Sequence, residues 1–153
     1  MFQSDGLSDG PEAWLARRGG DLPVLFFAPE RLSARHRAFR EGFPGEVTYA
    51  VKANPAERVV AQLVREGMSA FDVASPEEIA LVRRIAAGAR LHYHNPIRSR
   101  AEIAAGMEAG VASWSVDCAG ELDKLLDAGA EGEIAVRLAL PVAGGAYDFG
   151  PKF

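Results

Sequence analysis

The feature that most constrains the fold is a regular alternation of short apolar runs and amphipathic segments. The apolar runs are typical of buried strands and begin about 22 residues apart. A segment with helical spacing follows each of the first four. Strands that alternate with helices through tight loops predict a parallel sheet with helical crossovers. The predicted strands are Val47–Lys52, Ala70–Ala74, Arg90–His94, Ala112–Asp117 and Glu133–Leu138.

Start and stop signals mark the helices. Ser75–Glu78 combines a capping box with proline at the first helical position, and Ser99–Glu102 is a second capping box. Gly129 is placed to end the helix that follows the fourth strand. Upstream of the repeat, Val24–Ala28 predicts a separate strand and Glu30–Arg40 a helix.

This repeat is compatible with a doubly wound sheet or with a (β/α) barrel. No Gly-x-Gly-x-x-Gly follows the first strand, which disfavours a dinucleotide-binding fold. A closed barrel needs eight strands and typically about 250 residues, whereas this chain has 153. We therefore expect an α/β fold that is part of a TIM-like (β/α) barrel, truncated rather than an open sheet. Its expected parts are an N-terminal tail (1–22), a strand–helix lead-in (23–45) and a five-stranded barrel portion (46–153).

Composition narrows the possible partners. A formal charge of -4 and a pI near 5.4 disfavour nucleic acid as a partner. The N-terminus lacks the basic and apolar regions of a signal peptide, and no apolar run approaches the roughly 20 residues that span a bilayer. The single cysteine, Cys118, excludes an intrachain disulfide and a four-cysteine zinc site. We expect a soluble, cytoplasmic protein with no membrane partner.

Polar side chains lie near the carboxyl ends of the predicted strands. Lys52 ends the first strand, Asp72 lies late in the second and His94 closes the third. Asp117 ends the fourth strand, and Arg137 lies late in the fifth. Parallel strands buried on both faces are nearly all apolar, so these exceptions carry information. In α/β folds this edge of the sheet forms the ligand site.

The alternation of side chains along a strand predicts the face of the sheet on which each side chain lies. Ala50 and Lys52 share one face of the first strand, and Ala135 and Arg137 share one face of the fifth. We therefore expect Lys52 and Arg137 to point into a common interior, with the bulkier faces under the helices. Buried charges need partners, which Lys52, Asp72 and Arg137 could supply for one another.

Each of these residues also has a structural interpretation. A lysine at a strand end is usually a solvated residue at a loop entry, and Asp72 and Asp117 could be helix caps or loop formers. The spacing of His92 and His94 is compatible with metal ligands. Without a matching carboxylate cluster, packed strand histidines are favoured, and we expect no metal site.

Several motifs, in order, resemble those of one enzyme family. Tyr49–Pro55, with the sequence Tyr-Ala-Val-Lys-Ala-Asn-Pro, resembles the cofactor-lysine motif of the alanine-racemase-like (fold type III) pyridoxal-phosphate decarboxylases. Phe71–Ile79 resembles the second signature of this family. Further matches are His94–Ser99, Ser115–Asp117, Ala135–Leu138 and Phe149–Phe153. The resemblance covers nearly the whole chain from Val24.

This resemblance implies a barrel that carries pyridoxal 5'-phosphate, followed by a β-rich C-terminal domain that is absent here. It implies that Lys52 holds the cofactor covalently and that Ala50 lies in the cofactor-binding site. Asp72 would lie beside the lysine, orient it and transfer protons, and Arg137 would approach the cofactor ring. Lys152 would help to pair the two subunits of a homodimer.

The resemblance also implies a substrate class. Phe71–Ser75 is more similar to ornithine and lysine decarboxylases than to diaminopimelate decarboxylase. We expect decarboxylation of a basic amino acid, with ornithine to putrescine (polyamine biosynthesis) first and lysine or diaminopimelate as alternatives. The family's ring-stacking histidine, glycine-rich phosphate loop and cross-dimer cysteine belong to later sequence, so this chain alone is expected to be inactive. A non-catalytic regulatory relative and a cofactor carrier stay open as other classes.

Overall fold

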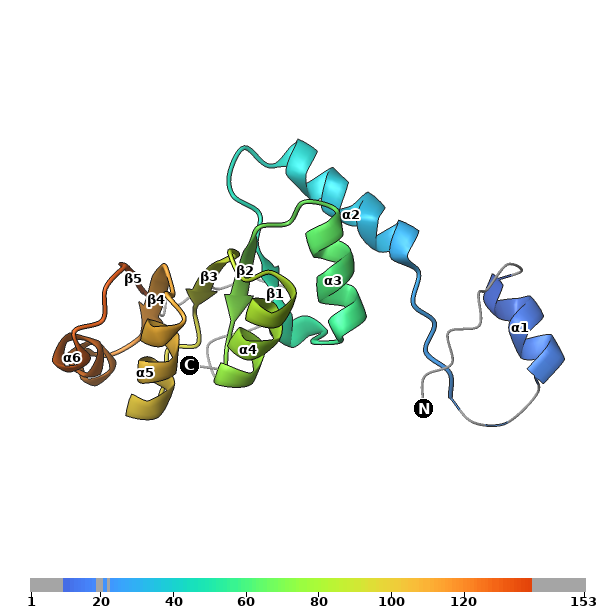
Figure 1. The fold of residues 1–153 in the computed structure, drawn as a ribbon. Helices are drawn as coiled ribbons and strands as arrows, with labels where there is room; N and C mark the ends of the chain where they lie inside the picture. The colour runs from blue at the N-terminus through green and yellow to red at the C-terminus, as the bar shows by residue number, and fades with distance from the viewer. Residues whose placement is uncertain (1–9, 19–20, 22, 139–153) are drawn as a thin grey trace, which may run out of the picture.

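The computed structural model describes residues 10–18, 21 and 23–138. Five parallel strands form one sheet in the order β1-β2-β3-β4-β5 (Figure 1). The strands are β1 (Tyr49–Ala50), β2 (Ala70–Val73), β3 (Arg90–Tyr93), β4 (Ser113–Val116) and β5 (Glu133–Val136). A doubly wound sheet reverses its strand order at a switch point, and this sheet does not. The sequential order is that of a partial (β/α) barrel.

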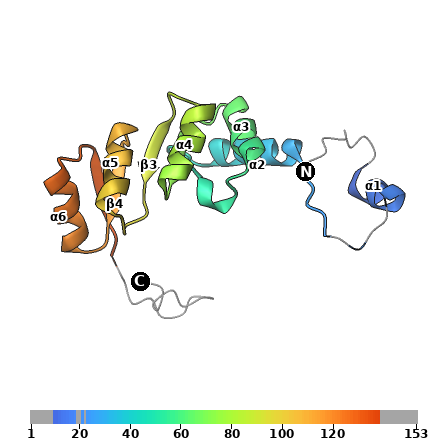
Figure 2. The same cartoon turned by 60° about the horizontal axis from the view of Figure 1, so that its bottom comes forward.

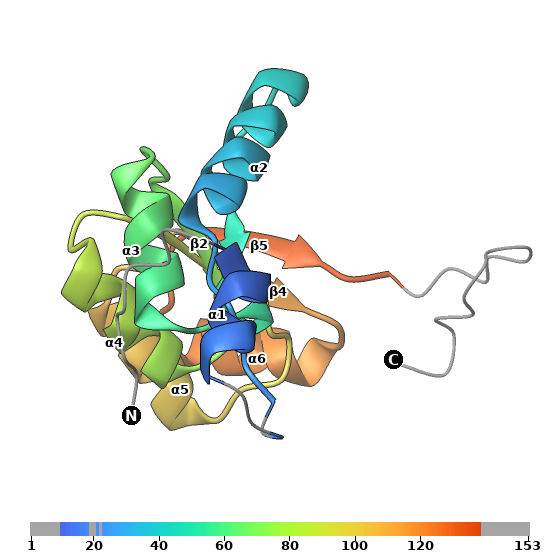
Figure 3. The ribbon, with the colours of Figure 1, turned by 90° about the vertical axis from the view of Figure 1, so that its right-hand side faces the viewer.

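Helices connect the strands and pack against one another along one side of the sheet (Figure 2). The connecting helices are α3 (Glu57–Arg65), α4 (Pro76–Ile85), α5 (Arg100–Glu108) and α6 (Ala119–Ala128), and a 3-10 turn η1 (Val51–Ala53) follows β1. Two more helices, α1 (Gly10–Arg18) and α2 (Pro29–Gly42), precede the first strand. From α2 to α6, each α-helix contacts the next. Figure 3 shows α2 projecting past the other helices. Among the described residues, no helix combines the length and apolarity needed to cross a membrane.

The two faces of the sheet differ in chemistry, as the alternation predicts. On the helix-covered face, Phe71 is in register with Leu91, and Tyr93 with Trp114, and all four are buried. These residues form the centre of the apolar core with Val59, Val60, Leu63, Val82, Ile103 and Leu125. The opposite face, which we call the open face, carries Ala50, Asp72, His92, Ser113 and Ser115.

The predicted helix signals are confirmed with one shift. Ser99 and Glu102 form the predicted reciprocal capping box at the start of α5. At α4, the Ser75 hydroxyl accepts from the Glu78 amide, but the Glu78 carboxylate accepts from the amide of Ala74 at 2.8 Å. The Glu78 carboxylate therefore accepts from the amide one residue before the N-cap Ser75, and not from the Ser75 amide as in a capping box. Gly129 ends α6 in the left-handed conformation, at φ 70°.

Two predicted strands differ from the structure. Val24–Ala28 forms no strand, because Phe27 packs against the apolar core instead of the segment pairing with a sheet edge. β1 has two residues rather than the predicted Val47–Lys52, because the chain turns into η1 at Val51. The predicted N-terminal tail contains α1, whose Trp14 contacts the Phe26 ring edge-on at 5.6 Å.

Candidate functional site

The first predicted site residue, Lys52, lies at the carboxyl edge of the sheet. Ala50 is the register partner of Asp72, and Lys52 follows two residues later in η1, which contacts β2. Lys52 is exposed, so the prediction that it is sheltered inside the fold is wrong for the described chain. The reason is that β1 is a two-residue strand at the edge of the sheet, where its open side has no neighbouring strand among residues 23–138.

Arg137 lies at the other edge of the sheet. It follows β5, and its amide donates to the carbonyl of Val116 at 2.8 Å, which extends the parallel pairing by one residue. The alternation of β5 puts it on the open face with Ala135, as predicted, but it is exposed rather than buried. Three strands separate it from Lys52 in the sheet, so the described structure does not bring these two residues together.

Asp72 is the partly buried member of the predicted set, with its side chain 23% exposed. Its Oδ1 lies 3.5 Å from Nδ1 of His94 and has no hydrogen bond in the described structure. An unpaired, buried carboxylate oxygen at this edge is a group available to a ligand or a neighbouring amine. The roles predicted for Lys52, Ala50, Asp72 and Arg137 stay predictions.

His92 of β3 and His94, which follows β3, belong to a continuous row of polar contacts across the open face. Nε2 of His92 lies 3.3 Å from Oε2 of Glu46, and its Nδ1 lies 2.7 Å from the Ser113 hydroxyl. The same hydroxyl lies 2.9 Å from Nε2 of His94, which in turn faces Asp72. The described residues hold no group of three or more His, Cys, Asp or Glu that could bind a metal.

The electrostatics of this row centre on His94. Burial lowers the pKa of His94 from its ordinary value; Asp72 opposes this shift, and His92, Arg137 and Arg98 add to it. His94 is therefore held in its neutral form, in which one ring nitrogen donates and the other accepts. Its position beside Asp72 could not be found from the sequence, because it depends on the register between β2 and β3.

A buried arginine that sequence analysis missed supports this edge of the sheet. Arg98 is 2% exposed and donates to the carbonyls of Tyr93, Asn95 and Ser115. Its guanidinium also stacks over the rings of Tyr93 and Trp114, at 5.4 Å from each centroid. Arg98 thus ties the loop after β3 to β4. Arginine is usually exposed, so no local pattern signals its burial.

Two side chains of α6 complete this support. The backbone amide of Arg98 donates to Oε2 of Glu121, which is 8% exposed. Lys124 donates to Oε1 of Glu121 at 2.6 Å and to the carbonyl of Arg98. The loop that carries His94 and Asn95 is therefore held between β4 and α6.

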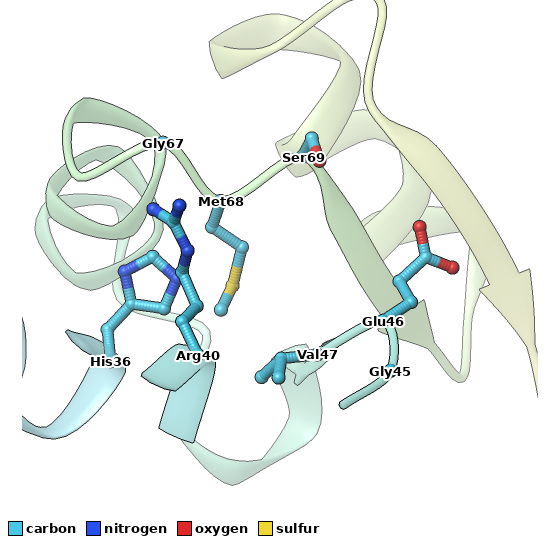
Figure 4. Close-up of a pocket in the computed structure, with 8 residues that line it drawn as sticks. All are labelled: His36, Arg40, Gly45, Glu46, Val47, Gly67, Met68 and Ser69. Carbon is cyan, nitrogen blue, oxygen red and sulfur yellow. The ribbon is translucent and has the colours of Figure 1, made fainter. Parts of the chain in front are cut away.

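A hollow of about 250 Å³ lies at the opposite, amino edge of the sheet (Figure 4). His36 and Arg40 of α2 line it on one side, and Gly45–Val47 and Gly67–Ser69, which precede β1 and β2, line the rest. Figure 4 shows the Glu46 carboxylate directed away from His36 and Arg40. The hollow is thus separate from the predicted site, although Glu46 connects it to His92.

Three further predictions concern the C-terminal segment and Asp117. Lys152 and the motif Phe149–Phe153 lie outside the described residues. Asp117 follows β4 and is exposed; the N-cap of α6 is Cys118, which is free and exposed and makes no side-chain cap. Asp117 is therefore not the N-cap residue.

The sequence of this chain matches one family of enzymes and several known decarboxylases. Residues 30–152 match the family described as "Pyridoxal-dependent decarboxylase, pyridoxal binding domain". The chain is 28% identical to the lysine/ornithine decarboxylase of Selenomonas ruminantium over 133 residues, which are 86% of this chain and 34% of that protein. It is 31% identical to the diaminopimelate decarboxylase of Pseudomonas aeruginosa over 134 residues, 84% of this chain and 31% of that protein.

Comparison with solved structures also finds decarboxylases. The Vibrio vulnificus lysine/ornithine decarboxylase complexed with putrescine matches with a TM-score of 0.71 and 30% identity, over 83% of this chain and 35% of that one. A mutant of SrLDC in complex with PLP matches with a TM-score of 0.75 and 27% identity, over 92% of this chain and 37% of that one. The chain thus spans about a third of the length of these relatives. It belongs to the pyridoxal-dependent decarboxylase family and corresponds to the pyridoxal binding domain.

Proposed function

We propose that this chain provides the lysine-bearing part of a decarboxylase that acts on a basic amino acid, with Lys52 as the residue that holds pyridoxal 5'-phosphate. The observation that carries the proposal is the position of Lys52. It lies within the Tyr49–Pro55 motif, at the carboxyl edge of a parallel sheet, two residues beyond the register partner of Asp72. An accessible amine at the same edge of the sheet as an unpaired carboxylate oxygen fits a carbonyl cofactor that must react with an amine.

The residues of the chain have distinct roles in this proposal. When bound, the cofactor supplies the electron sink for decarboxylation. Lys52 attaches the cofactor, and Ala50, which has a small side chain, leaves room for it over the open face. Asp72 orients the lysine amine and holds or releases a proton at Oδ1. Arg137 contributes positive charge at the far edge of the same face.

For the substrate we propose L-ornithine, with putrescine as the product. The similarity to lysine/ornithine decarboxylases of Selenomonas ruminantium and Vibrio vulnificus supports a diamino acid. The diaminopimelate decarboxylases among the relatives keep diaminopimelate as an alternative, beside lysine. We further propose a cytoplasmic homodimer for the whole protein, with Lys152 at the subunit contact.

Cofactor attachment can be tested on the chain itself, because its lysines are Lys52, Lys124 and Lys152. The chain is mixed with pyridoxal phosphate, the linkage is reduced with borohydride, and the modified peptide is mapped. We expect the label on Lys52 and the loss of visible absorbance in Lys52→Ala, with Lys152→Ala as the matched control. Equal labelling of the three lysines would contradict the proposed role of Lys52.

Turnover requires a second assay. Carbon dioxide release from ornithine, lysine and diaminopimelate is measured for the chain, with a full-length relative as the positive control. The exposure of Lys52 supports the expectation that the chain alone binds the cofactor without turnover. The same exposure favours the second candidate, a cofactor carrier. Measurable decarboxylation by the 153-residue chain would exclude the carrier and show that the site is sufficient.

A further inference from the structure

The row of contacts across the open face has a specific hydrogen-bonding problem. It contains four contacts that can each hold one proton, which we call gaps: Glu46 to His92, His92 to Ser113, Ser113 to His94, and His94 to Asp72. Both ends are carboxylates, which only accept when they are ionised. Two neutral imidazoles and one hydroxyl offer three protons for these four gaps. One gap is therefore left without a proton unless the row binds one more.

Two of the four buried side-chain atoms without a hydrogen bond among the described residues belong to the two outer contacts of this row; the other two are the Tyr93 hydroxyl and Nε of Arg98. Oδ1 of Asp72 and Nε2 of His92 are both buried without a hydrogen bond, and each faces its partner across one of the longer gaps, 3.5 and 3.3 Å. The two central contacts are short, at 2.7 and 2.9 Å, and share the Ser113 hydroxyl, which is 4% exposed. Leaving buried polar atoms unpaired is costly, and one added proton would pair both ends.

We infer that Glu46, His92, Ser113, His94 and Asp72 form a proton wire that stores one excess proton and delivers it to Asp72. In the resting form His92 carries the extra proton and donates to both Glu46 and Ser113. Ser113 then donates to Nε2 of His94, and Nδ1 of His94 donates to ionised Asp72. Because imidazole is more basic than a carboxylate, the excess proton rests on the His92 ring and not on Asp72.

To deliver the excess proton to Asp72, three protons each move across one hydrogen-bonded contact. The proton on Nδ1 of His92 passes to the Ser113 hydroxyl, the hydroxyl proton passes to Nε2 of His94, and the Nδ1 proton of His94 passes to Oδ1 of Asp72. His92 is left neutral with its proton on Nε2, still donating to Glu46. Four protons occupy the four gaps before and after transfer, so no buried atom becomes unpaired.

The positions of Glu46 and Asp72, at the two ends of the wire, fit the uptake of a proton at one end and its delivery at the other. Glu46 lines the hollow at the amino edge, and its side chain is 43% exposed, so solvent can restore the proton. Asp72 lies at the edge where the proposed chemistry occurs. Decarboxylation replaces a carboxyl group with a proton, so each turnover consumes one. The inference rests on the proposed function only for this use of the proton; the wire rests on the contacts.

Other charges that face the row influence which ring is protonated. Arg90 lies 3.4 Å from Glu46, Glu133 is the register partner of Ser113, and Arg137 and Arg98 act on His94. The lowered pKa of His94 supports a neutral His94 ring between Ser113 and Asp72.

Nitrogen-15 NMR of the 153-residue chain, labelled at histidine and free of cofactor, tests the wire directly. At pH 6 we expect two protonated ring nitrogens on His92, and a neutral His94 with its proton on Nδ1. His36 provides the third histidine signal and lies outside the row. The inference is overturned if His94 takes a second proton before His92, or if neutral His94 carries its proton on Nε2.

Variants of the two open-face serines test the connection. Titration of His92 should shift the Nε2 signal of His94 in the wild type, and Ser113→Ala should lose this shift. Ser113→Thr, which keeps the hydroxyl, should retain it. Ser115→Ala is the matched control, because the Ser115 hydroxyl donates to the His94 carbonyl and not between the rings. An equal loss in both alanine variants overturns the wire; if Ser113→Ala does not fold, the wild-type protonation states and Ser113→Thr decide.

These results do not depend on cofactor chemistry. Failure of the label to reach Lys52 would refute the proposed function and leave the NMR result standing. A wild-type His94 with its proton on Nε2 would refute the wire and leave labelling of Lys52 unaffected.

Discussion

Replacing Arg98 with methionine should destabilise the chain far more than any exposed arginine replacement. Arg98→Met keeps most of the side-chain volume but removes the donors to three carbonyls, including those of Tyr93 at 3.2 Å and Ser115 at 2.8 Å. Each buried carbonyl left unpaired costs about 1–3 kcal/mol. The loss of cation–π stacking over Trp114 adds about 1 kcal/mol.

At the lower end of these ranges the total is a decrease of about 4 kcal/mol in the free energy of unfolding, a large part of the roughly 5–15 kcal/mol of a typical domain. Urea unfolding followed by circular dichroism measures this decrease. Arg100→Met is the matched control, because Arg100 pairs with Asp127 at 3.2 Å with both side chains more than half exposed. That change should cost less than about 1 kcal/mol. Equal unfolding midpoints for the two variants would refute the structural role of Arg98.

Three further changes test packing and ionisation. Gly106→Ala should lower stability by about 1–3 kcal/mol in thermal melts, because its Cβ would lie 2.5 Å from the Trp114 ring; Gly120→Ala, whose Cβ meets nothing within 4 Å, should not. Burial raises the pKa of Tyr93 to about 12, whereas an unfolded tyrosine ionises near 10. Stability should therefore fall between pH 10 and 12, by up to about 3 kcal/mol, and urea midpoints of Tyr93→Phe should show a smaller fall. The pKa of His94 is lowered from 6.5 by burial, so the unfolded state takes up a proton first and stability is lost as pH falls below 6.5; an unchanged acid response in His94→Gln would contradict this.

Much of the fold could be predicted because it is encoded over short distances. The strand–helix repeat, the Ser99 capping box and the glycine stop at Gly129 depend on residues within a few positions of one another. The division of β2 into an apolar face and a polar face follows from its alternating side chains. These features need no knowledge of distant contacts, and the structure confirms them.

The candidate site could be predicted only in part. The sequence placed Lys52 and Asp72 near the carboxyl edges of neighbouring strands, and the register of β1 with β2 agrees. The sequence could not show that Lys52 is exposed, because burial depends on which strands cover an edge. The extended apolar run Val24–Ala28 was wrongly assigned as a strand for a similar reason, since a strand also needs a partner with free backbone groups.

By itself, the sequence determined the order of the five strands and the helices that connect them, the polar character of one sheet face and membership of a family through its ordered motifs. Only the tertiary structure decided that Ser113 joins His92 to His94 and that Arg98 is buried between β3 and β4. The reason is physical: hydrogen-bond partners and burial are set by pairing between segments about 20 residues apart, whereas periodicity and caps are set within one element.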